Sequence, residues 1–219
     1  KMLLENFEVI AEAENGIQQF QELVFSLAIR GAFKLQHSND KPASELLEKA
    51  TQEKLSQVKN QRKKQTKEIN PIEIPEDLNL PLNWEWSSLE NLGVINPRNE
   101  ISDDFNAGFV PMPLVPIDYR DAVSFETKQW SKIKKGYTHF ANDDVGLAKI
   151  TPCFENRKSV VFSNLPNGYG SGTTELIIFR PLSGVLNSKF VLLFFKSPFF
   201  LENGANQLTG TAGQKRVPR

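Results

Sequence analysis

Cysteine and histidine are scarce in this 219-residue sequence, which contains only Cys153, His37 and His139. A single cysteine excludes an internal disulfide and fits a reducing compartment. The histidines stand far apart, and neither has the spacing of a zinc site. We therefore expect no structural metal, no Ser-His-Asp triad and a cytoplasmic location. Cys153 follows a proline in an apolar segment, which favours a small core residue over a reactive thiol.

Long apolar runs and net charge are also missing. The longest apolar region, residues 185–200, is interrupted by Asn187, Ser188, Lys189 and Lys196, and a membrane span needs about 18 mainly apolar residues. The 26 Lys and Arg balance the 26 Asp and Glu. Global charge therefore favours no partner, membrane association is not expected, and only local charge can indicate a nucleic-acid contact.

Motifs for nucleotide binding and metal catalysis are incomplete. The glycine-rich segments 168–174 and 210–215 lack the full phosphate-loop pattern and read as turns. Segment 197–200, Ser-Pro-Phe-Phe, departs from the loop of a DNA amino-methyltransferase. Carboxylates that could hold a metal are Asp143, Asp144, Glu155 and Glu175, but the usual acid-x-Lys pair is missing near Glu175. A metal-dependent nuclease stays open as an alternative.

Two helical patterns fill the first third of the chain. Apolar residues recur at three- and four-residue steps over residues 2–31, which predicts one long helix that Gly16 weakens. A second helix is predicted over 43–67, with a thin apolar stripe. The two predict an antiparallel hairpin over residues 1–69, whose spare stripe would meet another helix or subunit. Its expected docking residues are Phe20, Leu23, Val24, Leu27, Leu46, Leu47, Leu55 and Val58.

The proline-rich residues 70–82 read as a linker, and residues 83–219 as a β-rich mixed domain. Strands are predicted over 123–130, 145–150, 159–162 and 175–180, with an irregular or edge strand over the proline-bearing 109–117. Segment 167–172 reads as a flexible turn, and segment 187–200 as a helix. The fold class is therefore α+β.

Basic and amide side chains gather in parts of this domain. Residues 127–142 contain four lysines and one histidine before the first acid at Asp143. Lys and Arg neutralise phosphates, whereas Arg, Lys, Gln, Asn and Thr also read base edges. On composition alone, a solvated face of mixed charge explains the pattern equally well. The candidate DNA-binding residues are Lys132, Lys134, Lys135, Thr138, His139, Lys149, Arg157, Lys158, Gln214, Lys215 and Arg216.

Motifs along nearly the whole chain decide between these interpretations. The segments concerned are 20–36, 39–47, 80–86 (LPLNWEW), 130–140 (WSKIKKGYTHF), 148–156 (AKITPCFEN), 172–176 (GTTEL) and 209–218 (TGTAGQKRVP). Together they resemble the specificity subunit of type I restriction–modification systems. The resemblance implies that residues 83–219 form a target recognition domain and that the helices act as spacer and docking region.

The resemblance also implies a non-catalytic subunit that reads one half of a bipartite double-stranded DNA site. Its partners would be methyltransferase (modification) subunits and, in the full complex, a restriction subunit. These partners would bind S-adenosylmethionine, ATP and Mg²⁺, so no cofactor is expected here. With one recognition domain, the chain fits either the front half of a full subunit or a half-length form that associates with itself through the hairpin; its abrupt ends favour the first.

Within that implied function, the lysines of 132–135 are expected to hold phosphates. Thr138, His139, Gln214 and Arg216 are candidates for base contacts. Segments 148–156 and 209–218 are expected to be scaffold or backbone contacts, because subunits that read different sequences share them. An assembly module that oligomerises without reading DNA stays open as a second alternative.

Overall fold

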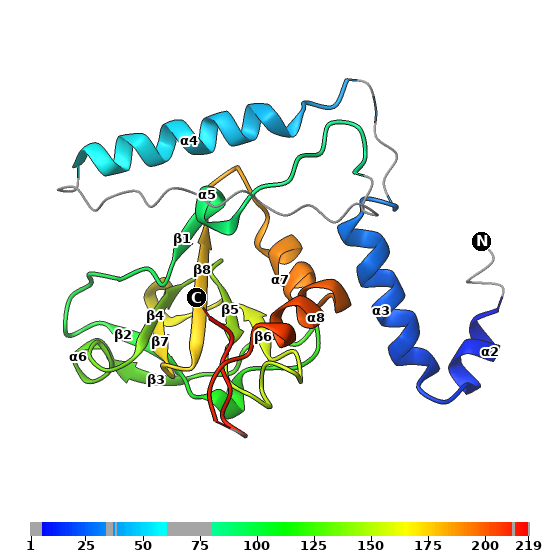
Figure 1. Ribbon diagram of the computed structural model, residues 1–219. Helices are drawn as coiled ribbons and strands as arrows, with labels where there is room; N and C mark the ends of the chain where they lie inside the picture. Colours follow the sequence, from blue (N-terminus) through cyan, green and yellow to red (C-terminus); the bar gives the residue numbers. More distant parts are fainter. Residues whose placement is uncertain (1–5, 34–36, 38, 61–79, 212, 219) are drawn as a thin grey trace.

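The computed structural model describes residues 6–33, 37, 39–60, 80–211 and 213–218, with no side chains for 55–60. In this part of the chain, helices flank a unit built on two four-stranded sheets (Figure 1). The expected α+β class is confirmed. Most of the predicted linker, and the end of the second predicted helix, lie outside the described residues. Across the described ranges, no helix has the length and apolar character needed to cross a membrane.

The first sheet is antiparallel throughout and has the strand order β1-β8-β5-β6. Its strands are β1 (Gly93–Ile95), β5 (Val145–Ala148), β6 (Ser159–Val161) and β8 (Leu176–Pro181). The last three confirm the predicted strands to within one or two residues. Every residue of β5 is buried, which explains why its sequence is continuously apolar rather than alternating.

The second sheet has the order β3-β2-β7-β4, in which β2 and β7 run parallel. Its strands are β2 (Asn106–Val110), β3 (Glu126–Gln129), β4 (Thr138–Ala141) and β7 (Tyr169–Gly172). β2 lies inside the sheet, so segment 109–117 is not an edge strand; it is irregular after Val110, as the other alternative expected. The prolines that suggested an edge come after the strand, where the short 3₁₀ helix η1 (Met112–Leu114) follows.

β7 corrects the prediction of a flexible turn over 167–172. The 3₁₀ turn η2 (Pro166–Gly168) leads into a strand whose last three residues are buried. The glycine allows neighbouring groups to approach closely, because a Cβ at Gly170 would lie 2.3 Å from the Phe140 ring and 2.6 Å from the Gly108 carbonyl oxygen. The glycines that suggested mobility therefore let β7 lie tightly between β2 and β4.

The core between the sheets is centred on two phenylalanine rings. Phe140 of β4 and Phe162, just after β6, stack with their centroids 3.7 Å apart and their planes 2° apart. Both are fully buried. Gly146 and Gly170 make room for them, because a Cβ at either position would lie within 3 Å of a ring atom. Cys153 packs against this core, as expected of an unreactive thiol.

Two helices cover the other face of the first sheet. α7 (Ser188–Lys196) buries Val191, Leu192 and Phe195 against a second apolar cluster that contains residues of β5 and β8. α8 (Pro198–Asn206) follows after Ser197, whose hydroxyl accepts the backbone N–H of Phe200. The single helix predicted over 187–200 is therefore two helices, because proline at the first helical position begins a new one.

The first helical segment is a bent arm rather than one helix. α2 (Phe7–Glu12) and α3 (Gly16–Ile29) are separated by a turn. Gly16 permits the bend, because a Cβ there would lie 1.8 Å from the Ile10 carbonyl oxygen. The prediction of a continuous helix over residues 2–31 was therefore wrong. Gly16 starts a new helix instead of weakening one. We call α2 and α3 the helical arm.

The second long helix does not pair with this arm. α4 (Ala43–Asn60) runs along the top of the β-rich unit in Figure 1 and packs beside α5 (Leu89–Leu92). α3 diverges from α4 and packs against α7 and α8. Ala50 of α4 is 1% exposed, so part of its thin stripe is already covered. The expected antiparallel hairpin is thus not what the described residues form; each helix uses the β-rich unit as its partner.

Candidate nucleic-acid interface

The basic turn predicted to contact DNA is mounted on buried anchors. It begins with α6 (Trp130–Ile133), whose Trp130 and Ile133 are each 2% exposed. Between and after these anchors, Lys132 and Lys135 are exposed. Gly136 follows with a left-handed φ of 80° and turns the chain into β4. The alternation of buried and exposed residues places the two lysines outside and fixes the backbone beneath them. We call residues 132–135 the basic turn.

Side chains from two neighbouring strands hold the carbonyl groups at the end of α6. The buried Ser171 hydroxyl of β7 donates a hydrogen bond of 2.8 Å to the Ile133 carbonyl. Nε2 of His139, in β4, lies 2.8 Å from the Lys134 carbonyl oxygen. The last carbonyls of a helix have no partner within the helix, so such contacts stabilise its end.

His139 is a buried part of this mount. Its side chain is 5% exposed, and its ring meets Trp130 edge-on with 4.6 Å between centroids. Nδ1 accepts a hydrogen bond of 3.2 Å from the backbone N–H of Asn99. Burial lowers the pKa of His139 below its ordinary value; the contact with the Lys134 carbonyl opposes this shift and nearby Arg98 adds to it. The expectation that His139 contacts a base is corrected, because both ring nitrogens are used inside the fold.

A buried polar network continues from His139 into the first sheet. Asn99 donates to the Phe140 carbonyl and accepts from Arg180 of β8, at 2.8 and 2.9 Å. Arg180 also makes two 2.7 Å hydrogen bonds to the 1% exposed carboxylate of Asp144. Burial raises the pKa of Asp144, and the hydrogen bonds from Arg180 oppose that rise. The network thus ties the mount of the basic turn to both sheets.

Ion pairs separate the lysines of this region into two kinds. Lys134 pairs with Asp103 at 2.6 Å, and Lys128 pairs with Glu126 at 2.8 Å. Among the described salt bridges, none involves Lys132 or Lys135. These two lysines are therefore the cations of the basic turn that are open to a phosphate, whereas Lys134 must first leave Asp103.

One cation near the turn was missed in the sequence. Arg98 is exposed and donates a hydrogen bond of 3.2 Å to the Tyr137 carbonyl, across 39 positions of the chain. No spacing rule connects these two positions, because the contact depends on how the loop after β1 passes the start of β4. Thr138, the first residue of β4, is half-buried beside this loop and stays a candidate for a base contact.

A second group of predicted DNA contacts forms a structural clamp. Arg216 makes two hydrogen bonds, of 2.9 and 2.8 Å, to the carboxylate of Glu175, and the pKa of Glu175 is lowered mainly by this contact. The backbone of Lys215 exchanges hydrogen bonds with Thr151, and the carbonyl of Lys149 accepts from Val217. This geometry agrees with the expectation that segments 148–156 and 209–218 are scaffold. Gln214 and the Lys215 side chain are exposed and stay candidates for DNA contact.

The third group, Arg157 and Lys158, is half-buried and bonded within the fold. The Arg157 side chain pairs with Glu22 of α3. Lys158 donates to the Met112 carbonyl at 3.1 Å. Beside them, the 1% exposed Lys196 donates to the carbonyls of Ile117 and Arg157, and burial lowers its pKa to about 8. A cavity of about 490 Å³ lies between this group and α3. Arg157 and Lys158 are therefore both engaged within the fold, and their predicted contact with DNA stays a prediction.

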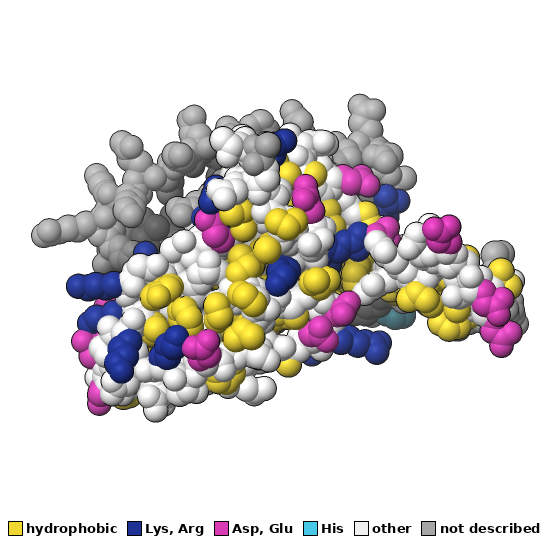
Figure 2. Space-filling model, turned by 90° about the horizontal axis from the view of Figure 1, so that it is seen from below, with side chains coloured by type: hydrophobic (Ala, Val, Ile, Leu, Met, Phe, Trp, Pro, Cys, Tyr) yellow, Lys and Arg dark blue, Asp and Glu magenta, His cyan; other side chains and the backbone are white. Residues whose placement is uncertain are grey.

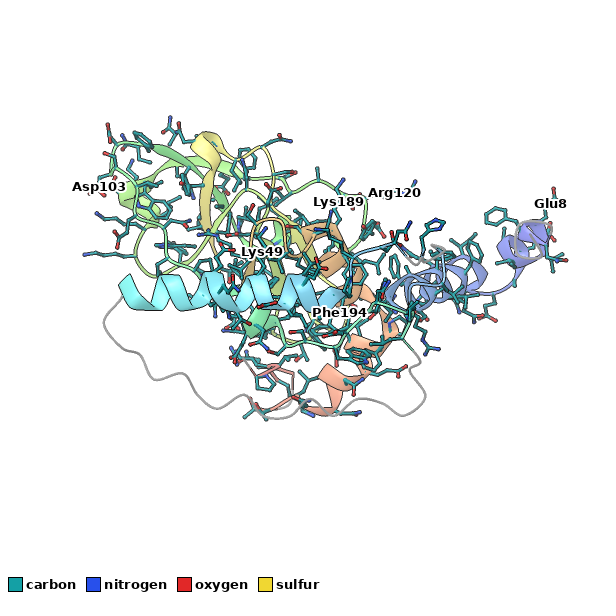
Figure 3. All side chains as sticks on the ribbon, turned by 90° about the horizontal axis from the view of Figure 1, so that it is seen from above. Glu8, Lys49, Asp103, Arg120, Lys189 and Phe194 are labelled. Atoms are coloured by element: carbon teal, nitrogen blue, oxygen red, sulfur yellow. The ribbon has the colours of Figure 1, made fainter. Side chains whose placement is uncertain are left out.

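Charge is distributed unevenly between the two ends of the molecule. Residues 6–29 of the arm contain four glutamates and no Lys or Arg. Figure 2 shows this arm in yellow, magenta and white, whereas dark blue side chains are spread over the rest of the visible face. Figure 3 places Asp103, the ion-pair partner of Lys134, at the opposite end from Glu8 of α2. The acidic arm therefore repels a phosphate backbone, whereas Lys132 and Lys135 of the basic turn are exposed cations that can attract one.

Comparison with known proteins gives no match to a family model. The type I restriction enzyme EcoAI specificity subunit of Escherichia coli is 50% identical over 206 residues, which is 93% of this chain and 35% of the relative. The EcoEI specificity subunit of the same species is 48% identical over 208 residues, with the same two coverages. By sequence, the chain corresponds to a segment of a type I restriction specificity subunit. It spans about a third of the length of these relatives.

The carboxylates considered for a nuclease do not converge in the described residues. Asp144 is bound by Arg180 and Glu175 by Arg216. In the described residues, no group of three or more His, Cys, Asp or Glu side chains could hold a metal ion. The nuclease alternative therefore gains no support from the geometry.

The expected docking residues are divided between two helices that face different ways. On α3, Leu23 is 41% exposed and lies on the same arm as the exposed Phe7, Val9 and Ile17. Phe20, Val24 and Leu27 are half-buried. On α4, Leu46 is 39% exposed and Leu47 half-buried, while the side chains of Leu55 and Val58 lie outside the described part. The arm thus presents the larger apolar surface.

Proposed function

We propose that this chain is the DNA-reading and docking part of a non-catalytic specificity subunit, which recognises one half of a bipartite double-stranded target. The observation that carries the proposal is the pair of exposed lysines on a rigidly anchored turn. Its context is the chain's identity of about half its residues to two specificity subunits. Lys132 and Lys135 hold phosphates, and neighbouring side chains such as Thr138 reach base edges.

The helical arm supplies the docking surface in this proposal. Its exposed Phe7, Val9, Ile17 and Leu23 are apolar, and its charges are all acidic. Such a surface suits the methyltransferase subunits or a second helical region, and self-association would use the same face. A restriction subunit completes the cytoplasmic complex. S-adenosylmethionine, ATP and Mg²⁺ are bound by these partners, and this chain binds no cofactor.

A binding experiment tests the DNA-reading part directly. The chain is incubated with duplexes that carry a randomised segment, and the retained pool is sequenced. Enrichment of a short, gapless motif supports the proposal, since one recognition domain reads one half-site. A retained pool with the composition of the input overturns it, as it leaves only an assembly role.

Two double variants identify the contact surface. Lys132→Ala with Lys135→Ala is expected to weaken binding to a labelled 30-bp duplex of random sequence, and to lower the salt slope by about one for each phosphate that is no longer neutralised. Lys49→Ala with Lys189→Ala removes two exposed lysines from α4 and α7 and is the matched control. Equal salt slopes for the two variants would show that the basic turn does not contact DNA.

A further inference from the structure

The buried His139 has a defined hydrogen-bonding state, because both of its neighbours are backbone groups. The Asn99 N–H can only donate, so Nδ1 must carry a lone pair. The Lys134 carbonyl can only accept, so Nε2 must carry the proton. The neutral tautomer with the proton on Nε2 is the one form of imidazole that serves both contacts.

This donated hydrogen bond acts directly beneath the exposed lysines. α6 is a helix of only four residues, so it cannot fix its own end through internal hydrogen bonds. Its last carbonyl, of Ile133, is held by Ser171, and the next, of Lys134, is held by His139. Lys135 follows at once, and Lys132 lies in the same turn. The two buried side chains therefore determine where both exposed ammonium groups project.

We infer that His139 is a positioning residue for the DNA-contacting turn, acting through the hydrogen bond from Nε2 to the Lys134 carbonyl. This role rests on the proposed DNA-reading function and explains a histidine that touches no ligand itself. Preorganised cations lose less conformational freedom on binding phosphates, and their geometry matches a fixed phosphate spacing. The polar network through Asn99, Arg180 and Asp144 extends the support to both sheets.

Two substitutions separate positioning from packing. His139→Gln keeps an amide donor near the place of Nε2, whereas His139→Asn keeps an oxygen near the place of Nδ1 and cannot reach the Lys134 carbonyl. Both remove the imidazole ring that packs on Trp130, so the two variants are matched in their packing against that side chain. The full chain is used, with the labelled 30-bp random-sequence duplex as probe and circular dichroism to verify folding at the assay temperature.

The expected result is a difference between the two variants. His139→Gln binds within about threefold of the wild type, whereas His139→Asn binds roughly tenfold more weakly, with a salt slope lower by about one. If His139→Asn does not fold, Ser171→Ala removes the other carbonyl contact and is expected to lower affinity and salt slope in the same sense. Equal affinities for the two folded His139 variants, or an unchanged Ser171→Ala when it serves instead, overturn the positioning role.

The Lys132→Ala/Lys135→Ala double variant distinguishes failure of this inference from failure of the proposed function. If that variant binds DNA like the wild type, the contact surface and the positioning role are both overturned. If it binds weakly while His139→Gln and His139→Asn behave alike, the lysines contact DNA and only the positioning role falls.

Discussion

Gly170→Ala is predicted to be among the most destabilising single-methyl additions in the β-rich unit. The added Cβ would lie 2.3 Å from a ring carbon of Phe140 and 2.6 Å from the Gly108 carbonyl oxygen. The ring cannot move aside freely, because it is fully buried and stacked on Phe162. Nor can the carbonyl, which belongs to the paired strand β2.

Overpacking of a well-packed core typically lowers the free energy of unfolding by about 1 to 3 kcal/mol. Because two clashes occur together here, we expect a loss of about 3 kcal/mol. For a chain of this size, that loss corresponds to a melting temperature lower by about 6 to 12 °C. Urea unfolding followed by circular dichroism gives the free energy, and a thermal scan gives the temperature shift.

Gly136→Ala is the control, because a Cβ there meets nothing within 4 Å. Its left-handed φ of 80° alone is expected to cost about 1 to 2 kcal/mol. If Gly170→Ala proves no more destabilising than Gly136→Ala, the close approach of β7 to β2 and β4 around Phe140 is not what the structure describes, and the explanation given for the glycines of β7 is wrong.

Three further predictions concern charged and titrating groups. Because the folded-state pKa of His139 is lowered, the unfolded chain binds an extra proton below about pH 6.5. The free energy of unfolding should therefore decrease as the pH is lowered through this range, and urea titrations of His139→Gln should show a flatter dependence on pH. Arg216 lowers the folded-state pKa of Glu175, so this carboxylate contributes stability above its unfolded pKa, and that stability is lost as the pH falls through the folded value. Arg216→Ala should raise the pKa of Glu175 in a carbon-13 NMR titration. An unchanged pKa would contradict the clamp. Charge reversal of Glu22 or of Arg157 should lower the free energy of unfolding, and exchanging the two charges in a double variant should restore part of it. The coupling energy from this double-mutant cycle should be about 0.5 to 1 kcal/mol. A coupling energy of zero would mean that this pair does not hold the arm.

The parts of the fold that could be predicted are those in which burial of apolar side chains alone determines the sequence pattern. β5 and the first four residues of β8 are apolar and largely buried, and the bounds of both strands were predicted to within one or two residues. β7 could not be predicted, because Gly170 and Gly172 look like flexible residues until Phe140 and the neighbouring backbones are in place. The same residue type thus signals mobility or tight packing, depending on partners that sequence spacing does not show.

The candidate site was predicted in part for a similar reason. The local cluster of lysines identified the basic turn, since Lys132 and Lys135 are neighbours in sequence. Which lysine is open was decided by Asp103, about 30 positions away from Lys134. His139 was found as a polar residue in a basic segment, but its burial depends on Trp130 and Asn99. The ion pair of Arg157 could not be predicted, because its partner, Glu22, lies 135 positions away on the arm.

The parallel pairing of β2 with β7 has a consequence for how the domain folds. It joins Gly108 to Gly170, and the edge strand β4 reaches the rest of its sheet through β7. Bringing such distant segments together costs loop-closure entropy before any contact repays it, which slows folding. During synthesis, β2 can pair with β3, but its other edge and β4 must wait for residues 169–172. Until then they expose unpaired backbone and the Phe140 ring, which makes this interval the period of greatest exposure to aggregation.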